Sequence, residues 1–216
     1  MPSSTGSAEK HGRGALSRAR ILEAALGLVD REGLAALSMR RLGAELGVEA
    51  MSLYNHVPSK AAVLDGLQEV ILDALPLPCP APDWVEVLRG AARAFHGALA
   101  AHPNALPLFA SRPPVTPAAL RHVDAALGVL RGAGFGPESC VGAYQALIAF
   151  VVGHALASSG PAGDASAPRH GALSREELPH LTAVVSGLKG HDARQDFEFG
   201  LDALLIGLRA RAMAER

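Results

Sequence analysis

Apolar side chains recur every three or four residues along most of the chain, and this is the spacing of one face of an α-helix. The first such segment covers residues 17–31 and stops before Gly33, a residue type suited to a helix C-cap. A short second helix is predicted after Ser38, a plausible N-cap, and it ends at Gly47. A third, still shorter helix is predicted at residues 49–55.

Longer helical segments follow. They are predicted at residues 59–75, 84–101, 117–132, 137–158, 176–188 and 192–213. Residues 76–83 and 102–117 are broken by several prolines, which remove backbone donors and clash with a preceding turn. Residues 158–177 have the composition of a mobile loop. No segment shows the alternation typical of a β-strand, so the pattern predicts an all-α protein with short N-terminal helices joined to a larger helical body.

Composition agrees with this fold class and limits the environment of the protein. The chain has 216 residues, 49% of them hydrophobic and only 4% aromatic, which favours a folded helical chain over a disordered one. Cys79 and Cys140 lie far apart and are expected to be unbridged. The most apolar run, residues 143–157, contains Gln145 and His154 and is interpreted as a buried helix. We expect a cytoplasmic protein with no signal peptide and no membrane span.

The net charge of −1 hides an uneven distribution. Residues 1–60 carry two more basic than acidic side chains, and residues 61–216 carry three more acidic than basic ones. Residues 1–15 are predicted to form a disordered basic arm. This small excess permits nucleic-acid binding by the N-terminal part but does not demonstrate it.

The short helices at residues 38–46 and 49–55, with a Gly47–Val48 turn between them, have helix-turn-helix spacing. A recognition helix needs small or polar residues where it approaches base edges, and "EAMS" at residues 49–52 meets that need. The outward positions of this pair are Ala50, Met51, Ser52, Tyr54, Asn55 and His56. Spacing alone leaves open a purely structural helix pair.

The stretches "LSMRRLGAELGV" and "SLYNHVPSK" resemble the DNA-binding region of the TetR family of transcriptional regulators. Later segments, among them "DWVEVLRGAARAFHGALAAHP" and "FEFGLDALLIGL", resemble the effector-binding body of its tetracycline-repressor branch. The resemblance implies a helix-turn-helix DNA-binding domain at residues 16–62 and a helical ligand-binding and dimerisation domain at residues 63–216. It also implies a ligand-responsive regulator, most simply a repressor, that is not an enzyme.

The resemblance assigns DNA contacts to particular residues. Arg40 stands where the family enters the major groove, and an arginine can bind guanine O6 and N7 together. Ala50 and Met51 stand at base-contacting positions and would meet a thymine methyl group. The remaining predicted DNA contacts are Ser38, Arg41, Ser52, Tyr54, Asn55, His56 and Lys60. The alternative role for Arg40 is that of a solvated surface arginine. The alternative role for Tyr54 is packing at the edge of the helix bundle.

The effector pocket is expected inside the body. The candidate lining residues are Phe95, Leu99, Leu106, Leu108, Phe109, Ser111, Arg112, Val123, Leu127, Tyr144, Gln145 and Ile148, each with core packing as an alternative role.

Leu108 stands where tetracycline repressors hold a metal-binding histidine, and Ala91 and Ala126 stand where they hold amides. Leucine cannot hold a divalent ion. We therefore expect no metal, no cofactor and a mostly apolar effector, and Arg112 should find an acceptor.

Three histidines have the chemistry of metal ligands. His96 and His102 are six residues apart and do not share a helix face, so they make a poor metal pair. His154 is predicted to be a hydrogen-bonded core histidine. The sequence therefore supplies no metal-binding histidine cluster.

The resemblance also implies a homodimer, formed by the last helix and by residues 141–158, that binds a palindromic double-stranded DNA operator. A monomer whose glycines only provide packing space is the alternative. An enzyme is disfavoured because no hydrolase, zinc or phosphate-loop motif is present in the sequence. A DNA-binding protein with a closed pocket and no effector also stays open, and the size of the pocket discriminates between the two.

Overall fold

The computed structural model describes residues 15–159, 177–187 and 192–215, and every described element is a helix. The α-helices are α1 (Arg18–Glu32), α2 (Met39–Leu46), α3 (Ala50–Leu53), α4 (Lys60–Asp73), α5 (Trp84–Ala101), α6 (Leu106–Ser111), α7 (Pro117–Gly132), α8 (Pro137–Ser158), α9 (Pro179–Gly187) and α10 (Ala193–Ala214). Two 3₁₀ turns, η1 (Leu34–Ala36) and η2 (Pro103–Ala105), complete the list. The all-α prediction is confirmed. The predicted arm up to residue 14 and most of the predicted loop lie outside the described residues.

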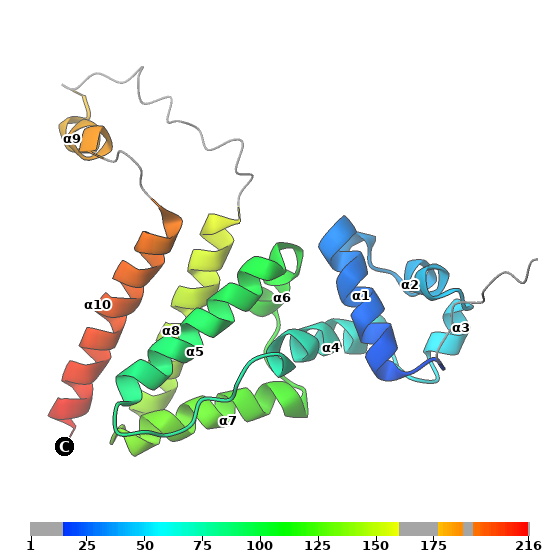
Figure 1. Cartoon of the computed structure of the whole chain (residues 1–216), viewed down its shortest axis with the longest axis horizontal. Helices are drawn as coiled ribbons and strands as arrows, with labels where there is room; N and C mark the ends of the chain where they lie inside the picture. Colours follow the sequence, from blue (N-terminus) through cyan, green and yellow to red (C-terminus); the bar gives the residue numbers. More distant parts are fainter. Residues whose placement is uncertain (1–14, 160–176, 188–191, 216) are drawn as a thin grey trace, which may run out of the picture.

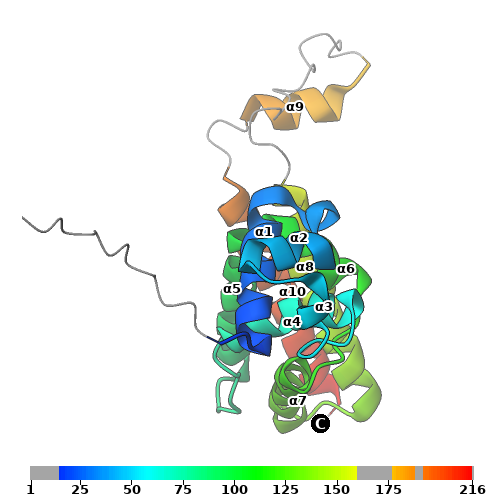
Figure 2. The same cartoon turned by 90° about the vertical axis from the view of Figure 1, so that its right-hand side faces the viewer.

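The helices are arranged along one long axis. Helices α1, α2 and α3 form a head at one end, and α8 and α10 lie at the other end (Figure 1). Helix α4 runs from the head into the body formed by α5–α8 and α10. Seen from the head, α1, α2 and α3 lie in front of the body helices, and α9 stands apart from them (Figure 2).

Serine caps fix where the N-terminal helices begin. The hydroxyl oxygens of Ser17, Ser38 and Ser59 accept hydrogen bonds from backbone N–H groups three residues on, at 3.3, 3.1 and 3.1 Å. Each serine satisfies one of the donors that a helix N-terminus leaves free. Gly47 closes α2 with φ 68° and ψ 34°, a left-handed conformation that glycine adopts without strain. The predicted caps at Gly33, Ser38 and Gly47 are confirmed.

Two hydrophobic clusters hold the chain together. The body cluster is built from α5, α7, α8 and α10 and includes Leu99, Leu130 and Leu201. The head cluster joins α1, α2 and α3 to α4, and it also takes in Ala105 and Leu108 from the body. The head is therefore packed directly onto α4 and α6.

The sequence pattern missed one helix. Residues 102–117 were expected to be broken by proline, but they contain η2 and α6. Pro103 and Pro107 fall in the first turn of these elements, where a missing N–H leaves no intrahelical bond unmade. The prediction for the third helix was too long, because α3 spans only Ala50–Leu53.

Helix α8 is long and apolar enough to cross a bilayer by length and composition alone. A core helix of a folded protein passes the same test. Six of its residues are buried against the body: Cys140, Ala143, Leu147, Val151, Val152 and Ala155. Both cysteines are free, Cys140 buried in α8 and Cys79 exposed, as the spacing predicted.

Candidate DNA-binding surface and ligand cavity

The angle between α2 and α3 depends on a glycine. A Cβ added to Gly43 would lie 2.9 Å from the Val48 carbonyl oxygen and 3.1 Å from the Ala50 backbone nitrogen. Real Cβ atoms do not approach a backbone oxygen that closely, so only glycine allows this approach of the two helices. Gly43 was not among the functional residues predicted from the sequence. The sequence feature that could have indicated its role is its position inside a predicted helix, where glycine costs stability.

The predicted DNA-contacting side chains gather around this helix pair at the end of the head. Arg40, Met51, Tyr54, Asn55, His56 and Lys60 are exposed, whereas Ala50 and Ser52 are partly buried. Met51 is 72% exposed although it is a large apolar residue. Leu53, between these residues, is fully buried in the head cluster and anchors α3. The helix pair and the turn that follows it therefore expose one large apolar side chain and several polar ones.

The two neighbouring arginines of α2 have different surroundings. Arg41 pairs with Glu32 at 2.6 Å and with Glu45 at 3.3 Å, and so braces α2 against α1. Arg40 makes no ion pair or hydrogen bond with any described residue. Ser38 is already engaged, because its oxygen caps α2. Arg40 is therefore the α2 cation that is free to meet an anionic or base partner.

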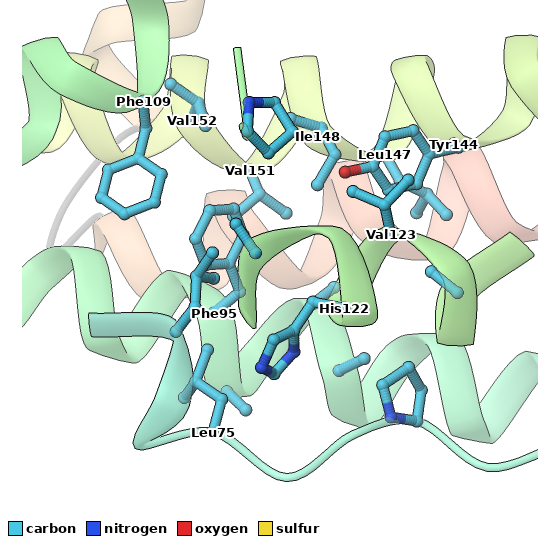
Figure 3. A pocket seen from close by; sticks show the side chains of 18 of the residues that line it. Leu75, Phe95, Phe109, His122, Val123, Tyr144, Leu147, Ile148, Val151 and Val152 are labelled. Carbon is cyan, nitrogen blue, oxygen red and sulfur yellow. The ribbon is translucent and has the colours of Figure 1, made fainter. Parts of the chain in front are cut away.

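A cavity of about 150 Å³ lies inside the body, between α4, α5, α6, α7 and α8. One water needs roughly 10–15 Å³ measured in the same way, so the cavity has room for an organic molecule. Aliphatic and aromatic side chains make up most of its wall, and Figure 3 shows Phe95, Phe109, Val123 and Ile148 facing it. The predicted alternative of a closed pocket therefore has no support in the geometry.

Half of the predicted pocket residues line this cavity: Phe95, Phe109, Arg112, Val123, Tyr144 and Ile148. The others lie elsewhere: Leu99 and Leu106 in the body core, Leu127 packed against that core, Leu108 in the head cluster, Ser111 donating to the Pro107 carbonyl, and Gln145 exposed. Helical periodicity marks the whole buried face of a helix. It does not separate a side chain in the core from one at a cavity wall.

The cavity also has polar lining residues that the sequence analysis missed. Gln68 of α4 is only 3% exposed, and its Nε2 donates to the backbone carbonyls of Leu108 at 3.0 Å and Arg112 at 3.2 Å. His122 of α7 is the other missed polar group. Each stands as a polar residue on an otherwise apolar helix face, which was the signal available in the sequence.

Arg112 has the acceptor that its partial burial demands. Its Nε and one Nη donate to Asp65 Oδ1 of α4 at 3.0 and 2.6 Å. Together with Gln68, this pair ties the C-terminal end of α6 to α4 at two points. The cavity wall and the helix that carries the head are thus joined by three hydrogen-bonding side chains.

Charged groups that could hold a metal ion do not converge within the described residues, where no three His, Cys, Asp or Glu side chains form a cluster. His96 and His154 are hydrogen-bonded to each other, with 2.9 Å between Nε2 and Nδ1. Burial, reinforced by His154, lowers the pKa of His96. His102 instead contacts Asp30 of α1 at 2.9 Å. His154 is hydrogen-bonded as predicted, although it is only partly buried.

A helix-turn-helix head joined by one helix to a body that encloses an apolar cavity defines a ligand-responsive DNA-binding regulator. The profile "Bacterial regulatory proteins, tetR family" matches residues 21–67, and "Tetracyclin repressor-like, C-terminal domain" matches residues 76–212. The chain belongs to the TetR family, whose members are DNA-binding transcriptional regulators.

Known relatives extend the likeness over almost the whole chain. The tetracycline repressor protein class A from transposon 1721 of Escherichia coli is 33% identical over 201 residues, covering 91% of this chain and 92% of the relative. Apo ActR from Streptomyces coelicolor superposes with a TM-score of 0.85 at 31% identity, covering 93% of this chain and 98% of ActR. ActR in complex with actinorhodin gives a TM-score of 0.83 at 31% identity, covering 92% and 99%.

Proposed function

We propose that the chain acts as a homodimer, binds a palindromic operator through its two heads, and releases it when a mostly apolar small molecule enters the cavity. The single observation that carries this proposal is the position of α4, which belongs to both sites. Val63 and Leu67 of α4 lie in the head cluster, whereas Gln68 and Leu72 line the cavity. We also propose that the chain has no catalytic role. We propose that it acts in the cytoplasm, where the DNA is accessible.

Helix α4 supplies the coupling between the two sites. A ligand can shift the heads only if it binds better to one position of α4 than to another. Gln68 and Asp65 hold α4 to the end of α6, so a ligand that displaces α6 also displaces α4. Coupling free energies between two such sites are typically ~1–3 kcal/mol. Operator and effector would then weaken each other's binding by the same factor.

The exposed side chains of the head support the assignment of DNA contacts. Arg40 and Lys60 are exposed cations without ion-pair partners among the described residues. Met51 is placed for apolar contact with a thymine methyl group, and Tyr54 for a phosphate. Arg41 stays within the proposed contact set, although it would first have to leave or share its two glutamates.

A second copy of the chain is proposed to cover the outer face of α10. Phe199, Ile206 and Met213 are 79%, 69% and 72% exposed, and they are spaced seven residues apart. Ala203 and Ala210 fall between them and complete an alternating three- and four-residue spacing, the pattern of a helix–helix seam. Val141 and Leu156 are exposed apolar residues of α8, the helix that packs beside α10. Large apolar patches of this kind mark interfaces.

An open cavity favours a regulator with an effector over one without. A protein that needed no ligand would gain stability by filling this space, because buried voids cost free energy. The likeness to ActR, which has been solved with actinorhodin bound, also supports a small-molecule effector. Ala91 and Ala126 line the cavity and stand where the tetracycline repressors hold amide side chains. This difference supports an effector that makes no such amide contacts.

The test is a footprint on the DNA that flanks the gene for this protein, at two salt concentrations. A protected palindrome is expected, with protection weakened at least tenfold in an Arg40→Ala/Tyr54→Ala double variant. Arg131→Ala, which removes an exposed arginine from α7, is the matched control and should bind like the parent protein. Release of the protected DNA by members of a small-molecule library then tests the effector role.

Protection without sequence preference would contradict the operator assignment. So would a double variant that binds as tightly as the Arg131→Ala control. A library that binds in the cavity but never changes operator affinity would contradict the effector role and leave DNA binding intact.

A further inference from the structure

The polar groups of the cavity wall restrict the chemistry of its ligand. Among the described residues that line the cavity, four carry a polar side chain, namely Gln68, Arg112, His122 and Tyr144, and none carries a carboxylate. Buried polar groups of a ligand must find partners on this wall, since an unpaired one costs free energy. The hydrogen-bonding state of these four side chains therefore defines what the ligand needs to offer.

Two of the four are already engaged. The Arg112 guanidinium pairs with Asp65, so its charge is neutralised within the protein. The Gln68 amide nitrogen donates to two backbone carbonyls at 3.0 and 3.2 Å. The wall thus offers an anion no unpaired arginine or lysine, and it offers a cation no carboxylate.

His122 remains available as a hydrogen-bond acceptor. Burial lowers the pKa of His122, and the attraction of Asp73 only partly offsets this. The ring is therefore neutral at pH 7, with one protonated and one unprotonated nitrogen. The nearby backbone of Leu72 favours the protonated ring and, like Asp73, only partly offsets burial. The unprotonated nitrogen of the neutral ring can accept a hydrogen bond.

Tyr144 remains available as a donor. Its hydroxyl projects from α8 into the cavity, and it makes no hydrogen bond with the described residues (Figure 3). Burial raises the pKa of Tyr144, so the phenol stays protonated at neutral pH. Elsewhere on the cavity wall, Phe95 and Phe109 meet edge to face, with ring centroids 5.4 Å apart. Such rings favour a flat, ring-containing partner.

We infer that the effector is an uncharged, flat, ring-containing molecule carrying a hydroxyl group that donates to His122 and a carbonyl or ether oxygen that accepts from Tyr144. This inference rests on the proposed function, in which the cavity is the effector site. It goes further by assigning the two polar contacts and by excluding anionic and cationic ligands. A charged ligand would have to leave water for a wall that offers it no counter-charge.

The test compares three ring compounds of nearly the same shape by isothermal titration calorimetry on the full chain: 2-hydroxy-9-fluorenone, 2-methoxy-9-fluorenone and 9-fluorenone-2-carboxylate. We expect the hydroxy compound to bind most tightly. The methoxy compound, which lacks the donor, should bind about 2- to 10-fold more weakly, as expected for one neutral hydrogen bond. The carboxylate should bind more weakly still.

Two variants assign the contacts. His122→Phe should abolish the difference between the hydroxy and methoxy compounds, and Tyr144→Phe should weaken both about equally. His180→Phe is the matched control, because His180 is an exposed histidine of α9 that does not line the cavity. It should leave ligand affinity unchanged. Thermal unfolding of each variant verifies that the fold is retained, so that lost binding is not lost structure.

Tightest binding of the carboxylate, binding of none of the three compounds, or indifference to both cavity variants would overturn the inference. None of these results would by itself overturn the proposed function. That function is tested separately, by the release of operator DNA with a chemically diverse library. Release by charged members of that library alone would keep the effector site and refute the assigned chemistry.

Discussion

At the scale of single residues, the head depends on the absence of one Cβ. Gly43 lies in the middle of α2, where alanine would ordinarily be the better residue, because glycine costs about 1 kcal/mol in a helix interior. The backbone of Val48 and Ala50 occupies the space that a side chain would need. The helix-turn-helix geometry is thus specified at the expense of local helix stability.

Gly43→Ala is expected to weaken operator binding at least tenfold and to lower the melting temperature, because backbone atoms cannot move aside without shifting α3. The measurement is operator affinity by fluorescence anisotropy together with thermal unfolding. Gly97→Ala in α5 is the matched control, because no atom lies within 4 Å of its added Cβ. That control should be stabilised by roughly 0.5–1 kcal/mol. Equal behaviour of the two variants would disprove the role of Gly43.

His122 predicts a pH dependence with a defined sign. Burial depresses its pKa in the folded protein below the ordinary value of 6.5, with Asp73 opposing and Arg121 reinforcing the effect of burial. The unfolded chain therefore binds a proton at higher pH than the folded one. The stability that neutral His122 contributes is complete above about pH 6.5 and is lost as the pH falls toward the lowered value.

Urea unfolding at pH 7.5, 6.5 and 5.5 measures this dependence. The decline in the free energy of unfolding between pH 7.5 and 5.5 should be smaller in His122→Phe than in the parent protein. His96, whose pKa is also lowered by burial, contributes a separate part of the decline that this variant keeps. Identical slopes in both proteins would count against a neutral His122.

At the scale of elements, α4 is the part of the fold with two functions. One face of α4 packs into the head cluster through Val63, Leu67 and Ile71. From the same helix, Gln68 donates to the Leu108 and Arg112 carbonyls of α6 and its C-cap. At its outer edge, Glu69 holds Arg18 of α1 through two hydrogen bonds of 2.6 and 3.0 Å, and Arg18 in turn lowers the pKa of Glu69. Movement of α4 therefore changes contacts with the head and the body together.

Gln68→Leu preserves the size of the side chain but leaves the Arg112 carbonyl without the Gln68 donor, whereas the Leu108 carbonyl still accepts from the backbone N–H of Arg112. A buried unsatisfied polar group costs about 1–3 kcal/mol, and we expect a loss of stability of that order in urea unfolding. Ligand binding should then release operator DNA less efficiently, because α6 is no longer tied to α4. Gln195→Leu, an exposed position on α10, is the control and should be neutral. Unchanged release in Gln68→Leu would refute this coupling route.

At the scale of the whole molecule, the head and the proposed interface lie at opposite ends of the long axis (Figure 1). Ion pairs hold α10 in place on the body, since Arg93 of α5 bonds Glu198 at 2.7 Å and Arg89 bonds Asp202. The outer face of α10 is then left with its seam of apolar side chains. Two copies joined there would place two heads on one DNA duplex.

Ile206→Glu puts a charge in the middle of that seam, where burial against a second copy would be costly. We expect a monomer in sedimentation velocity and a large loss of operator affinity, because one head makes half the contacts. Val115→Glu, an exposed apolar position outside α8 and α10, should leave both properties unchanged. A dimeric Ile206→Glu protein would show that the interface lies elsewhere.

The sequence by itself determined the helices, their serine and glycine caps, and the helix-turn-helix pair, because these follow from local periodicity and from caps three residues away. It did not determine α6, whose prolines indicated a break, or which apolar residues face a cavity. Leu108 and Phe109 are neighbours in sequence, yet Leu108 packs into the head cluster and Phe109 lines the cavity.

Only the tertiary structure decided the polar pattern of the cavity wall. Gln68 and Arg112 are 44 residues apart, and their hydrogen bond exists because α4 and α6 pack together. The same packing pairs Arg112 with Asp65 and leaves His122 and Tyr144 available to a ligand. Local sequence sets which groups a helix carries, but long-range packing sets which of them are already satisfied, and that difference defines the chemistry of the site.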